Sequence, residues 1–353
     1  MKLERIRRAH GLMGWHRSCR LAALLVAFLY SSLIAVEAAD TLESLRGFTM
    51  GTSWSVKYLA PANAPAKAEV GRALQALLDR LEGQISTWRD DTDLSRFNAA
   101  RSADWFPMPR QTAQIAMEAQ RISELTGGAF DVTVDPIVRL WGFGPHGRPG
   151  TVPSAQAIEE ARVKVGWQKL AVRLDPPALK KSLAALSVDL SALAPGFAAD
   201  EIGGWLETHG ITNYLADASE LRARGRDSGG RPWRVGVERP VPGRREADRV
   251  LSLDNVSLAT SGDYRNFFEK EGRRYTHIVD PRTGQADARV AAVTVAHPLA
   301  MTADALATGL MVLGPEAGMK LAREQRWAVQ FIVRDGRSLR RMTTPEFDRL
   351  VVP

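Results

Sequence analysis

The sequence predicts an α+β fold in which mixed β-sheets are flanked by helices. One indication is a stripe of apolar residues at helical spacing across Lys67–Ile85. Another is the set of short segments with alternating apolar residues, such as Trp54, Val56 and Tyr58. The order of the elements is the third, because strands and helices mix without the regular β-α-β repeat of a parallel α/β protein.

The helices are recognised by period and by end signals. Gly127-Gly128 is a usual helix stop, and Ser154 after Pro153 is a usual helix start. We expect helices at Lys67–Ile85, Thr112–Leu125, from Ser154 onward, at Gly196–Thr208 and at Thr302–Leu313.

Strands are expected where apolar residues alternate between turn signals. The Asp280–Gly284 segment (DPRTG) predicts a tight turn, and Asp335-Gly336 predicts a hairpin. The expected strands are Gly47–Tyr58, Leu170–Leu174, Leu183–Leu190, Ile211–Leu215, Trp233–Val237, Val250–Thr260, Tyr275–Val279, Val290–Ala296 and Trp327–Val333.

The N-terminal 38 residues have the pattern of a secretory signal peptide. A basic flank precedes the apolar run Leu21–Val36, and small residues follow it, with cleavage expected near Ala38 or Ala39. The run is shorter than the roughly 20 residues of a comfortable membrane span, although an uncleaved leader that anchors the chain is the alternative. We therefore expect a signal peptide at 1–38, a folded domain at 40–353, and export to the periplasm.

Composition excludes several classes of protein. Without residues 1–38 the formal charge falls from +7 to +3 and the only cysteine, Cys19, is lost, so disulfides do not stabilise the domain. The basic charge is not gathered on a motif, which gives no support for nucleic acid binding. The sequence has no zinc-ligand spacing, Walker A motif, Rossmann glycine fingerprint or nucleophile elbow.

His277 is the candidate general base. The turn at Asp280–Gly284 is expected to hold it at the end of a short strand, beside the carboxylate of Asp280. A structural histidine is the alternative.

Asp304 and Thr308 are the candidate metal ligands. They lie four residues apart on an expected helix and therefore share a face. A carboxylate one turn from a hydroxyl suits Mg²⁺, which prefers hard oxygen ligands, but it also suits an ordinary helix surface. Other single residues have similarly plain alternatives: Trp88 and Trp141 as core residues, and Asp189 as a helix cap.

Taken together, seven ordered motifs are specific. They are MGT at 50–52, STWR with DLSRFN at 86–98, GAFDVTV with LWGFG at 128–144, DLSALAPGFAAD at 189–200, TSGDYR at 260–265, THIVDPRTG at 276–284 and ADALAT at 303–308. This set resembles the ApbE family, the Mg²⁺-dependent FAD:protein FMN transferases of the bacterial periplasm. The resemblance implies that FAD is split at its pyrophosphate, that FMN passes to a Thr or Ser hydroxyl of a redox protein, and that AMP leaves.

The resemblance also implies roles for individual residues. It assigns His277 to activation of the incoming hydroxyl. It assigns the metal to the carbonyl of Ala192, the carboxylate of Asp304 and the hydroxyl of Thr308. It assigns flavin contacts to Met50, Trp88, Ala129, Phe130, Asp131, Asp189 and Ile278.

Four positions depart from the family pattern. Ala307 stands where some members have a further acidic ligand, and Pro195 precedes Gly196 where a polar or charged residue is usual. Ala218 and Ser219 replace a Gly-Gly pair, which adds side chains and restricts positive φ. Two alternatives to transfer therefore remain at this stage: hydrolysis of FAD to FMN and AMP, and flavin binding without turnover.

Overall fold

The computed structural model describes residues 40–144, 147–244, 246–286, 288–336 and 338–352. The expected signal peptide lies outside these residues. Thr41–Pro353 form one compact unit, and the α+β prediction is confirmed for it. In the described part of the chain, no helix has the length and hydrophobicity needed to cross a membrane.

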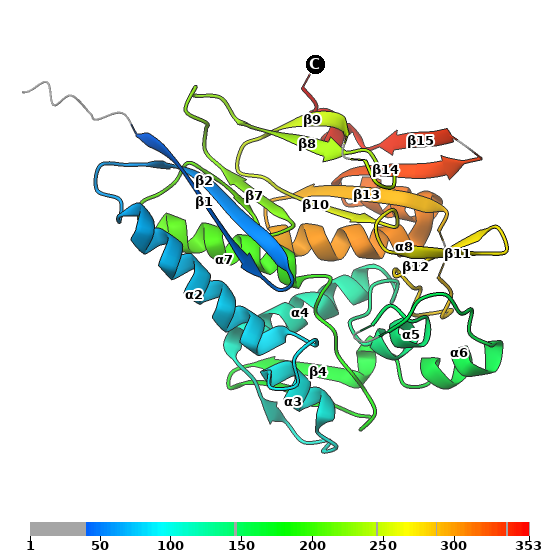
Figure 1. The fold of residues 1–353 in the computed structure, drawn as a ribbon. Helices are drawn as coiled ribbons and strands as arrows, with labels where there is room; N and C mark the ends of the chain where they lie inside the picture. Colours follow the sequence, from blue (N-terminus) through cyan, green and yellow to red (C-terminus); the bar gives the residue numbers. More distant parts are fainter. Residues whose placement is uncertain (1–39, 145–146, 245, 287, 337, 353) are drawn as a thin grey trace, which may run out of the picture. The chain divides into compact units, whose positions relative to one another are not determined.

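An eight-stranded sheet is the centre of the described unit (Figure 1). All of its neighbouring strands pair antiparallel. In spatial order the strands are β1 (Thr41–Thr49), β2 (Thr52–Ala60), β6 (Tyr214–Asp217), β7 (Leu221–Arg224), β10 (Ser257–Gly262), β13 (Val290–His297), β14 (Ala328–Asp335) and β15 (Ser338–Thr343).

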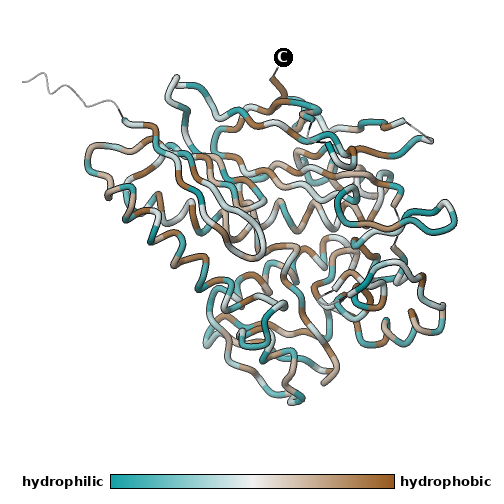
Figure 2. Tube along the Cα trace, viewed as in Figure 1, coloured by the Kyte–Doolittle hydropathy of each residue, from teal (hydrophilic) through white to brown (hydrophobic). Residues whose placement is uncertain are grey.

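Three helices cover one face of this sheet. They are α2 (Lys67–Ile85), α7 (Ala194–Thr208) and α8 (Ala300–Glu324). α8 packs on β10 and β13, α7 packs on α8, and α2 packs on β1 and α7. Figure 2 shows hydrophobic and hydrophilic residues alternating along α2, whose buried stripe joins the main core. Burial of this stripe is what holds an amphipathic helix against a sheet.

The opposite face is covered by the hairpin of β8 (Trp233–Glu238) and β9 (Ala247–Leu253), together with α9 (Pro345–Asp348). The other elements lie beside these layers. They are α3 (Asp93–Ala99), β3 (Phe106–Pro107), α4 (Arg110–Leu125), α5 (Asp135–Leu140), α6 (Ala155–Arg162), the 3₁₀ turn η1 (Trp167–Lys169), β4 (Leu170–Leu174), β5 (Pro177–Lys181), β11 (Phe267–Lys270) and β12 (Arg273–Thr276).

Two segments, each expected to form one strand, contain parts of two strands in the structure. The Gly47–Tyr58 segment is the β1–β2 hairpin, which turns at Met50 and Gly51 with φ of 46° and 75°. Positive φ at both central residues suits the right-handed twist of a hairpin. The Val250–Thr260 segment likewise contains parts of β9 and β10.

The expected strand Leu183–Leu190 is absent from the described fold, although its apolar side chains are largely buried. The Asn98 side chain donates to the Val188 carbonyl and accepts from its N–H, both at 2.8 Å. The Asn98 side chain thus forms the backbone hydrogen bonds that a neighbouring strand would form. The apolar residues of this segment alternate because every second side chain from Leu186 to Leu190 is buried, although the described structure shows no strand pairing there.

The helix expected to end at Leu313 continues after a break. Gly314 has φ 81° and ψ 172°, and Pro315 begins the second half of α8. Proline restarts a helix readily because its missing N–H falls among the unpaired donors of a first turn.

Candidate functional site

The first half of α8 is anchored at its N-terminus by Asp200. The two carboxylate oxygens of Asp200 accept from the N–H groups of Ala300 and Met301, at 3.0 and 2.9 Å. Arg222 pairs with Asp200 at 2.9 Å. A carboxylate at this end satisfies free N–H donors and complements the helix dipole. The anchor fixes the helix that carries Asp304 and Thr308.

Asp304 is 6 % exposed and is tied to α7. Its Oδ2 accepts from the Gly196 N–H at 3.1 Å. A Cβ on Gly196 would lie 2.4 Å from the Ala300 carbonyl oxygen, so only glycine allows this approach of α7 and α8. Burial raises the pKa of Asp304 well above its usual 3.8.

The Ala192 carbonyl is kept free of the helix bonds that normally form at such a position. Pro195 has no N–H, and the N–H of Gly196 goes to Asp304. Pro195 falls in the first turn of α7, where proline is well tolerated, so this departure is compatible with the helix.

The donor set fits a hard cation. Asp304 keeps Oδ1 for a ligand, Thr308 offers a hydroxyl, and Ala192 offers a carbonyl oxygen. The described residues contain no cluster of three or more His, Cys, Asp or Glu side chains able to hold a metal. Mg²⁺ does not need one, because it is commonly bound by one or two carboxylates with water and substrate phosphates.

Thr308 is linked to β10 by its hydroxyl, which lies 2.8 Å from the Ser261 hydroxyl. The next residue, Gly309, allows the Ala129–Asp131 segment to approach. A Cβ on Gly309 would lie 3.1 Å from Cβ of Phe130. The predicted flavin-contact segment therefore lies beside the predicted metal ligands.

Within that segment the side chains are committed to the protein. Ala129 and Phe130 are buried. Asp131 accepts from the N–H and hydroxyl of Thr133 at 2.8 and 2.7 Å, and from the Trp167 N–H at 2.9 Å. Contact with a ligand at these positions would fall to the backbone.

Met50 has an unusual conformation for a residue with a side chain, at φ 46°. Its N–H donates to Oε2 of Glu82 on α2 at 3.0 Å. Next to this turn, the Ser219 hydroxyl lies 3.4 Å from that of Thr52. Ser219 itself has φ 76°, so serine occupies a backbone conformation that glycine adopts without strain.

The two tryptophans behave differently. Trp141 is 1 % exposed, donates to the Gly284 carbonyl at 2.9 Å and stacks on Tyr275, which confirms its alternative as a core residue. Trp88 is 67 % exposed, so the core alternative is wrong for it. Its ring is accessible to a ligand.

His277 follows β12 directly instead of lying within a strand, and the turn after it is confirmed. Gly284 donates to the Asp280 carbonyl at 2.7 Å and has φ 73°. Nδ1 of His277 lies 3.1 Å from the Asn266 carbonyl oxygen, so Nδ1 carries the proton and Nε2 is an acceptor. Burial lowers the pKa of His277 below 6.5, which keeps the ring neutral at pH 7.

The expectation that Asp280 supports His277 is wrong. Both Asp280 oxygens bind the Arg282 guanidinium, at 2.9 and 2.8 Å. Asp280 pairs with Arg282 because the two residues flank Pro281 in the same turn. His277 instead donates to the Asn266 carbonyl.

Ile278 lines a pocket of about 260 Å³ with Arg289, Met311 and Val312. Met311 lies about one helical turn beyond Thr308. This pocket brings the His277–Ile278 segment to the helix of the predicted metal ligands.

Asp189 is held between two segments. Its N–H donates to the Val132 carbonyl at 2.7 Å, and its Oδ1 accepts from the Ser191 N–H at 2.9 Å. Burial raises its pKa. The carboxylate caps the local turn before α7, and not α7 itself, which has no side-chain cap.

Glu220 is a further acidic residue of this region that the sequence reasoning missed. Its Oε2 accepts from the Thr260 N–H at 3.0 Å. The only sequence signal was its place directly after Ala218-Ser219.

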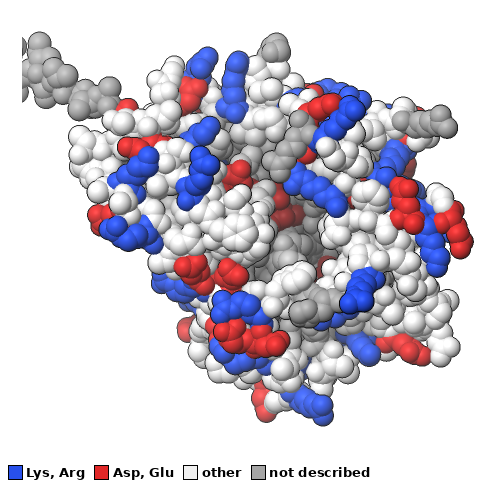
Figure 3. All heavy atoms as spheres, viewed as in Figure 1, with Lys and Arg blue, Asp and Glu red and all other residues white. Residues whose placement is uncertain are grey.

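Figure 3 shows a hollow near the centre of the view, with Asp or Glu atoms visible inside it. Figure 1 draws the start of α8 in the same part of the view.

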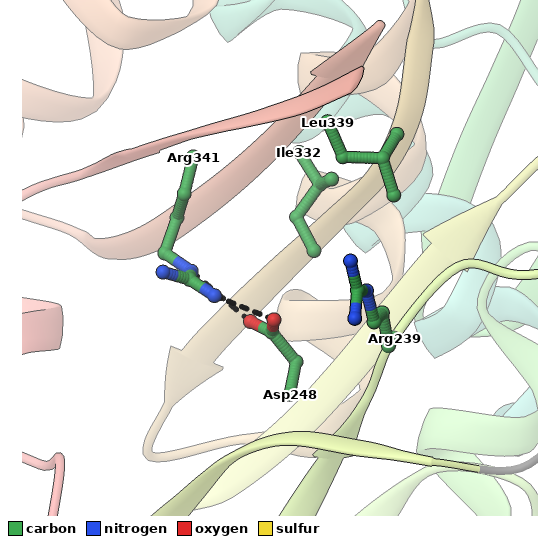
Figure 4. Close-up of a pocket in the computed structure, with 5 residues that line it drawn as sticks. All are labelled: Arg239, Asp248, Ile332, Leu339 and Arg341. Carbon is green, nitrogen blue, oxygen red and sulfur yellow. Dashed lines mark hydrogen bonds and ion pairs between the residues drawn. The ribbon is translucent and has the colours of Figure 1, made fainter. Parts of the chain in front are cut away.

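A separate pocket of about 250 Å³ is shown in Figure 4, with the Arg341–Asp248 ion pair on its wall. It lies on the other face of the sheet. Ile332, which lines it, aligns across the strands with Ala292 and Gly262, whereas Ser261 faces α8.

The described structure is thus an α+β protein in which helix α8 carries a buried carboxylate, Asp304, and a hydroxyl, Thr308, and in which the residue after His277 shares a pocket with the same helix. This chemistry suits a phosphate-containing ligand with a divalent cation.

Comparison with known proteins agrees with this class. The model of the ApbE family matches residues 50–333. An FAD:protein FMN transferase of Vibrio cholerae is 40 % identical over 292 residues, which cover 82 % of this chain and 87 % of the relative. One of Klebsiella pneumoniae is 38 % identical over 346 residues, covering 96 % and 98 %.

Solved structures agree as well. The apo form of the Pseudomonas stutzeri flavinyl transferase ApbE superposes with a TM-score of 0.81 at 40 % identity, covering 88 % of this chain and 97 % of that one. The flavin transferase ApbE of Vibrio cholerae gives the same TM-score at 37 % identity, covering 88 % and 100 %. The chain belongs to the ApbE family.

Proposed function

We propose that this protein is a Mg²⁺-dependent FAD:protein FMN transferase that modifies a Thr or Ser hydroxyl of a redox protein and releases AMP. The observation that supports the proposal is the buried Asp304 carboxylate, which accepts from the Gly196 N–H one helical turn before Thr308, in a chain of this family.

The proposed reaction exchanges a phosphoanhydride bond of FAD for a phosphoester bond on the acceptor. The acceptor hydroxyl oxygen attacks the phosphorus of the FMN half of FAD, and the bond from that phosphorus to the bridging oxygen breaks. AMP leaves with the bridging oxygen. Positioning and electrostatic stabilisation supply most of the catalysis in such a displacement. A bound Mg²⁺ would neutralise charge on the pyrophosphate oxygens.

His277 is the proposed base. The Asn266 carbonyl fixes the proton on Nδ1, which leaves Nε2 to accept the proton of the acceptor hydroxyl. A lowered pKa keeps the ring unprotonated at neutral pH. Trp88 offers an exposed apolar ring, which supports its proposed contact with the flavin.

We also propose that the protein acts after export, because the acceptor of this reaction would meet it outside the cytoplasm. The support is the leader pattern in residues 1–38.

Incubation with FAD and Mg²⁺, with and without an acceptor domain, tests the function. AMP that appears only with the acceptor, together with covalent flavin on that acceptor, is the expected result. AMP without acceptor would instead establish a hydrolase. Bound FAD without AMP in either incubation would establish a flavin-binding protein.

A further inference from the structure

Glu220 lies where β7 separates from β10. The two strands pair only at Leu221–Leu258 and Arg222–Ser257. The chain then turns away, with the Ala218 N–H bonded to the Glu220 carbonyl at 3.0 Å. The Glu220 carboxylate takes the place of the departing strand by accepting the Thr260 N–H at 3.0 Å.

This position connects Glu220 to the candidate metal ligands. Thr260 is followed by Ser261, whose hydroxyl bonds to that of Thr308 at 2.8 Å. Thr308 is one turn of α8 from Asp304. Glu220 is therefore linked to Asp304 through the Thr260 N–H, the Ser261–Thr308 hydrogen bond and one turn of α8.

The charges around Glu220 are mostly of its own sign. Burial raises its pKa well above 4.5, and the strongest charge effect is repulsion by Asp304. Asp217 adds to that repulsion, and Arg265 opposes it. Two neighbouring carboxylates disfavour each other's ionisation, and a cation bound between them would compensate the repulsion.

We propose that Glu220 is the second acidic group of the divalent-cation site formed by Asp304, Thr308 and the Ala192 carbonyl. The inference rests on the proposed function, which requires Mg²⁺. A second carboxylate fits the usual one or two in Mg²⁺ sites. It also replaces, from a different element, the charge that Ala307 does not provide on α8.

The test measures Mg²⁺ binding without FAD, by calorimetry, in wild type and Glu220→Gln. Glutamine keeps an acceptor for the Thr260 N–H but removes the charge. We expect Mg²⁺ affinity to fall about 10- to 100-fold, the usual effect of losing a group that supports a metal site. In EDTA, the variant should melt at the same temperature as wild type or higher, because a repulsion is removed. The rise in Tm on adding Mg²⁺ should shrink.

Glu238→Gln is the matched control, since Glu238 pairs with Arg265 in the segment between β10 and β11, and its loss should leave Mg²⁺ affinity unchanged. Wild-type affinity in Glu220→Gln would overturn the inference and make Glu220 only a cap for β10. If that variant binds Mg²⁺ normally while wild type transfers FMN, the proposed function stands and only the Glu220 assignment fails. If wild type binds no Mg²⁺ alone and transfers FMN without it, both fail.

Discussion

Ser261 and Thr308 join the central sheet to α8 through a hydrogen bond of 2.8 Å between their hydroxyl groups. One side of this bond is the TSGDYR motif and the other is the ADALAT motif, which are about 40 residues apart in the chain. The bond explains why two short polar motifs lie on elements that otherwise pack through apolar contacts. It also fixes the direction of the Thr308 hydroxyl, on which a metal ligand depends.

Replacing Asp304 with alanine should abolish turnover and leave the fold intact. The change removes the one acidic side chain among the predicted metal ligands. Activity would be measured as AMP release over a range of Mg²⁺ concentrations, with circular dichroism as the check on folding. Wild-type activity of Asp304→Ala at low Mg²⁺ would remove the metal assignment.

The stability of the metal-free protein should depend on pH through the same residue. Its folded-state pKa is raised, so the folded form disfavours ionisation. Stability contributed by protonated Asp304 is therefore present below pH 3.8 and is lost as the pH rises toward the raised pKa. Melting temperatures in EDTA should fall over this interval less steeply in Asp304→Asn than in wild type. Equal slopes for the two proteins would contradict the burial of an uncompensated charge.

His277→Ala should lower turnover roughly 10²- to 10⁴-fold with FAD affinity nearly unchanged, the usual size of general base catalysis. Because the neutral ring is the active form, wild-type kcat/KM should rise with pH up to a value below 6.5 and then level off. The variant should lose this inflection. A structural histidine would instead lower Tm and leave the activity of the folded fraction close to normal.

Glu82→Ala should raise the KM for FAD more than it lowers kcat. Glu82 accepts the Met50 N–H at 3.0 Å and holds a residue at φ 46° in the turn that carries the predicted flavin contact. Glu82→Gln keeps an acceptor and should recover most of the loss. Glu69→Ala, on the first turn of the same helix, is the control for loss of a carboxylate from α2. A parallel fall of kcat in all three variants would argue for a general effect on the helix.

Ser219→Gly and Ala218→Gly should affect different properties of the protein. Ser219 is exposed at φ 76°, where glycine relieves strain of roughly 1 kcal/mol, so this variant should keep its stability and gain FAD affinity or kcat/KM. Ala218 is buried, and glycine there should lower the free energy of unfolding by about 1 kcal/mol. Urea denaturation and FAD titration measure the two quantities. Unchanged FAD binding and turnover in both variants would indicate that this loop does not meet the ligand.

Local pattern predicted the long helices, because period and end signals are carried by neighbouring residues, but it missed the short helices α3, α5 and α9. α2 begins and ends at Lys67 and Ile85 as expected. The local pattern wrongly predicted a strand at Leu183–Leu190, where the hydrogen-bond partner of the backbone is the side chain of Asn98, about 90 residues away. The periodicity of a segment gives no information about a hydrogen-bond partner so far away in the sequence.

In the candidate site too, residues within short motifs could be predicted, whereas contacts between distant segments could not. Family motifs predict Asp304 and Thr308 as metal ligands, and the structure places Gly309, the residue after Thr308, against Phe130 of the Ala129–Asp131 segment. The partner of His277 was mistaken because Asp280 is near in sequence, whereas the Asn266 carbonyl is near in space. Glu220 was missed because its importance depends on where β7 leaves β10, which only the sheet register reveals.

The break at Gly314-Pro315 affects how the protein tolerates residues inserted into α8. In a continuous helix, one inserted residue rotates everything beyond it by about 100°. Here the helical phase is reset at Gly314, so the turns that carry Asp304 and Thr308 are insulated from additions in the second half. An alanine inserted between Pro315 and Gly318 should disturb the packing of Gly318 on Phe331 and lower stability, while the direction of Asp304 toward Gly196 is preserved.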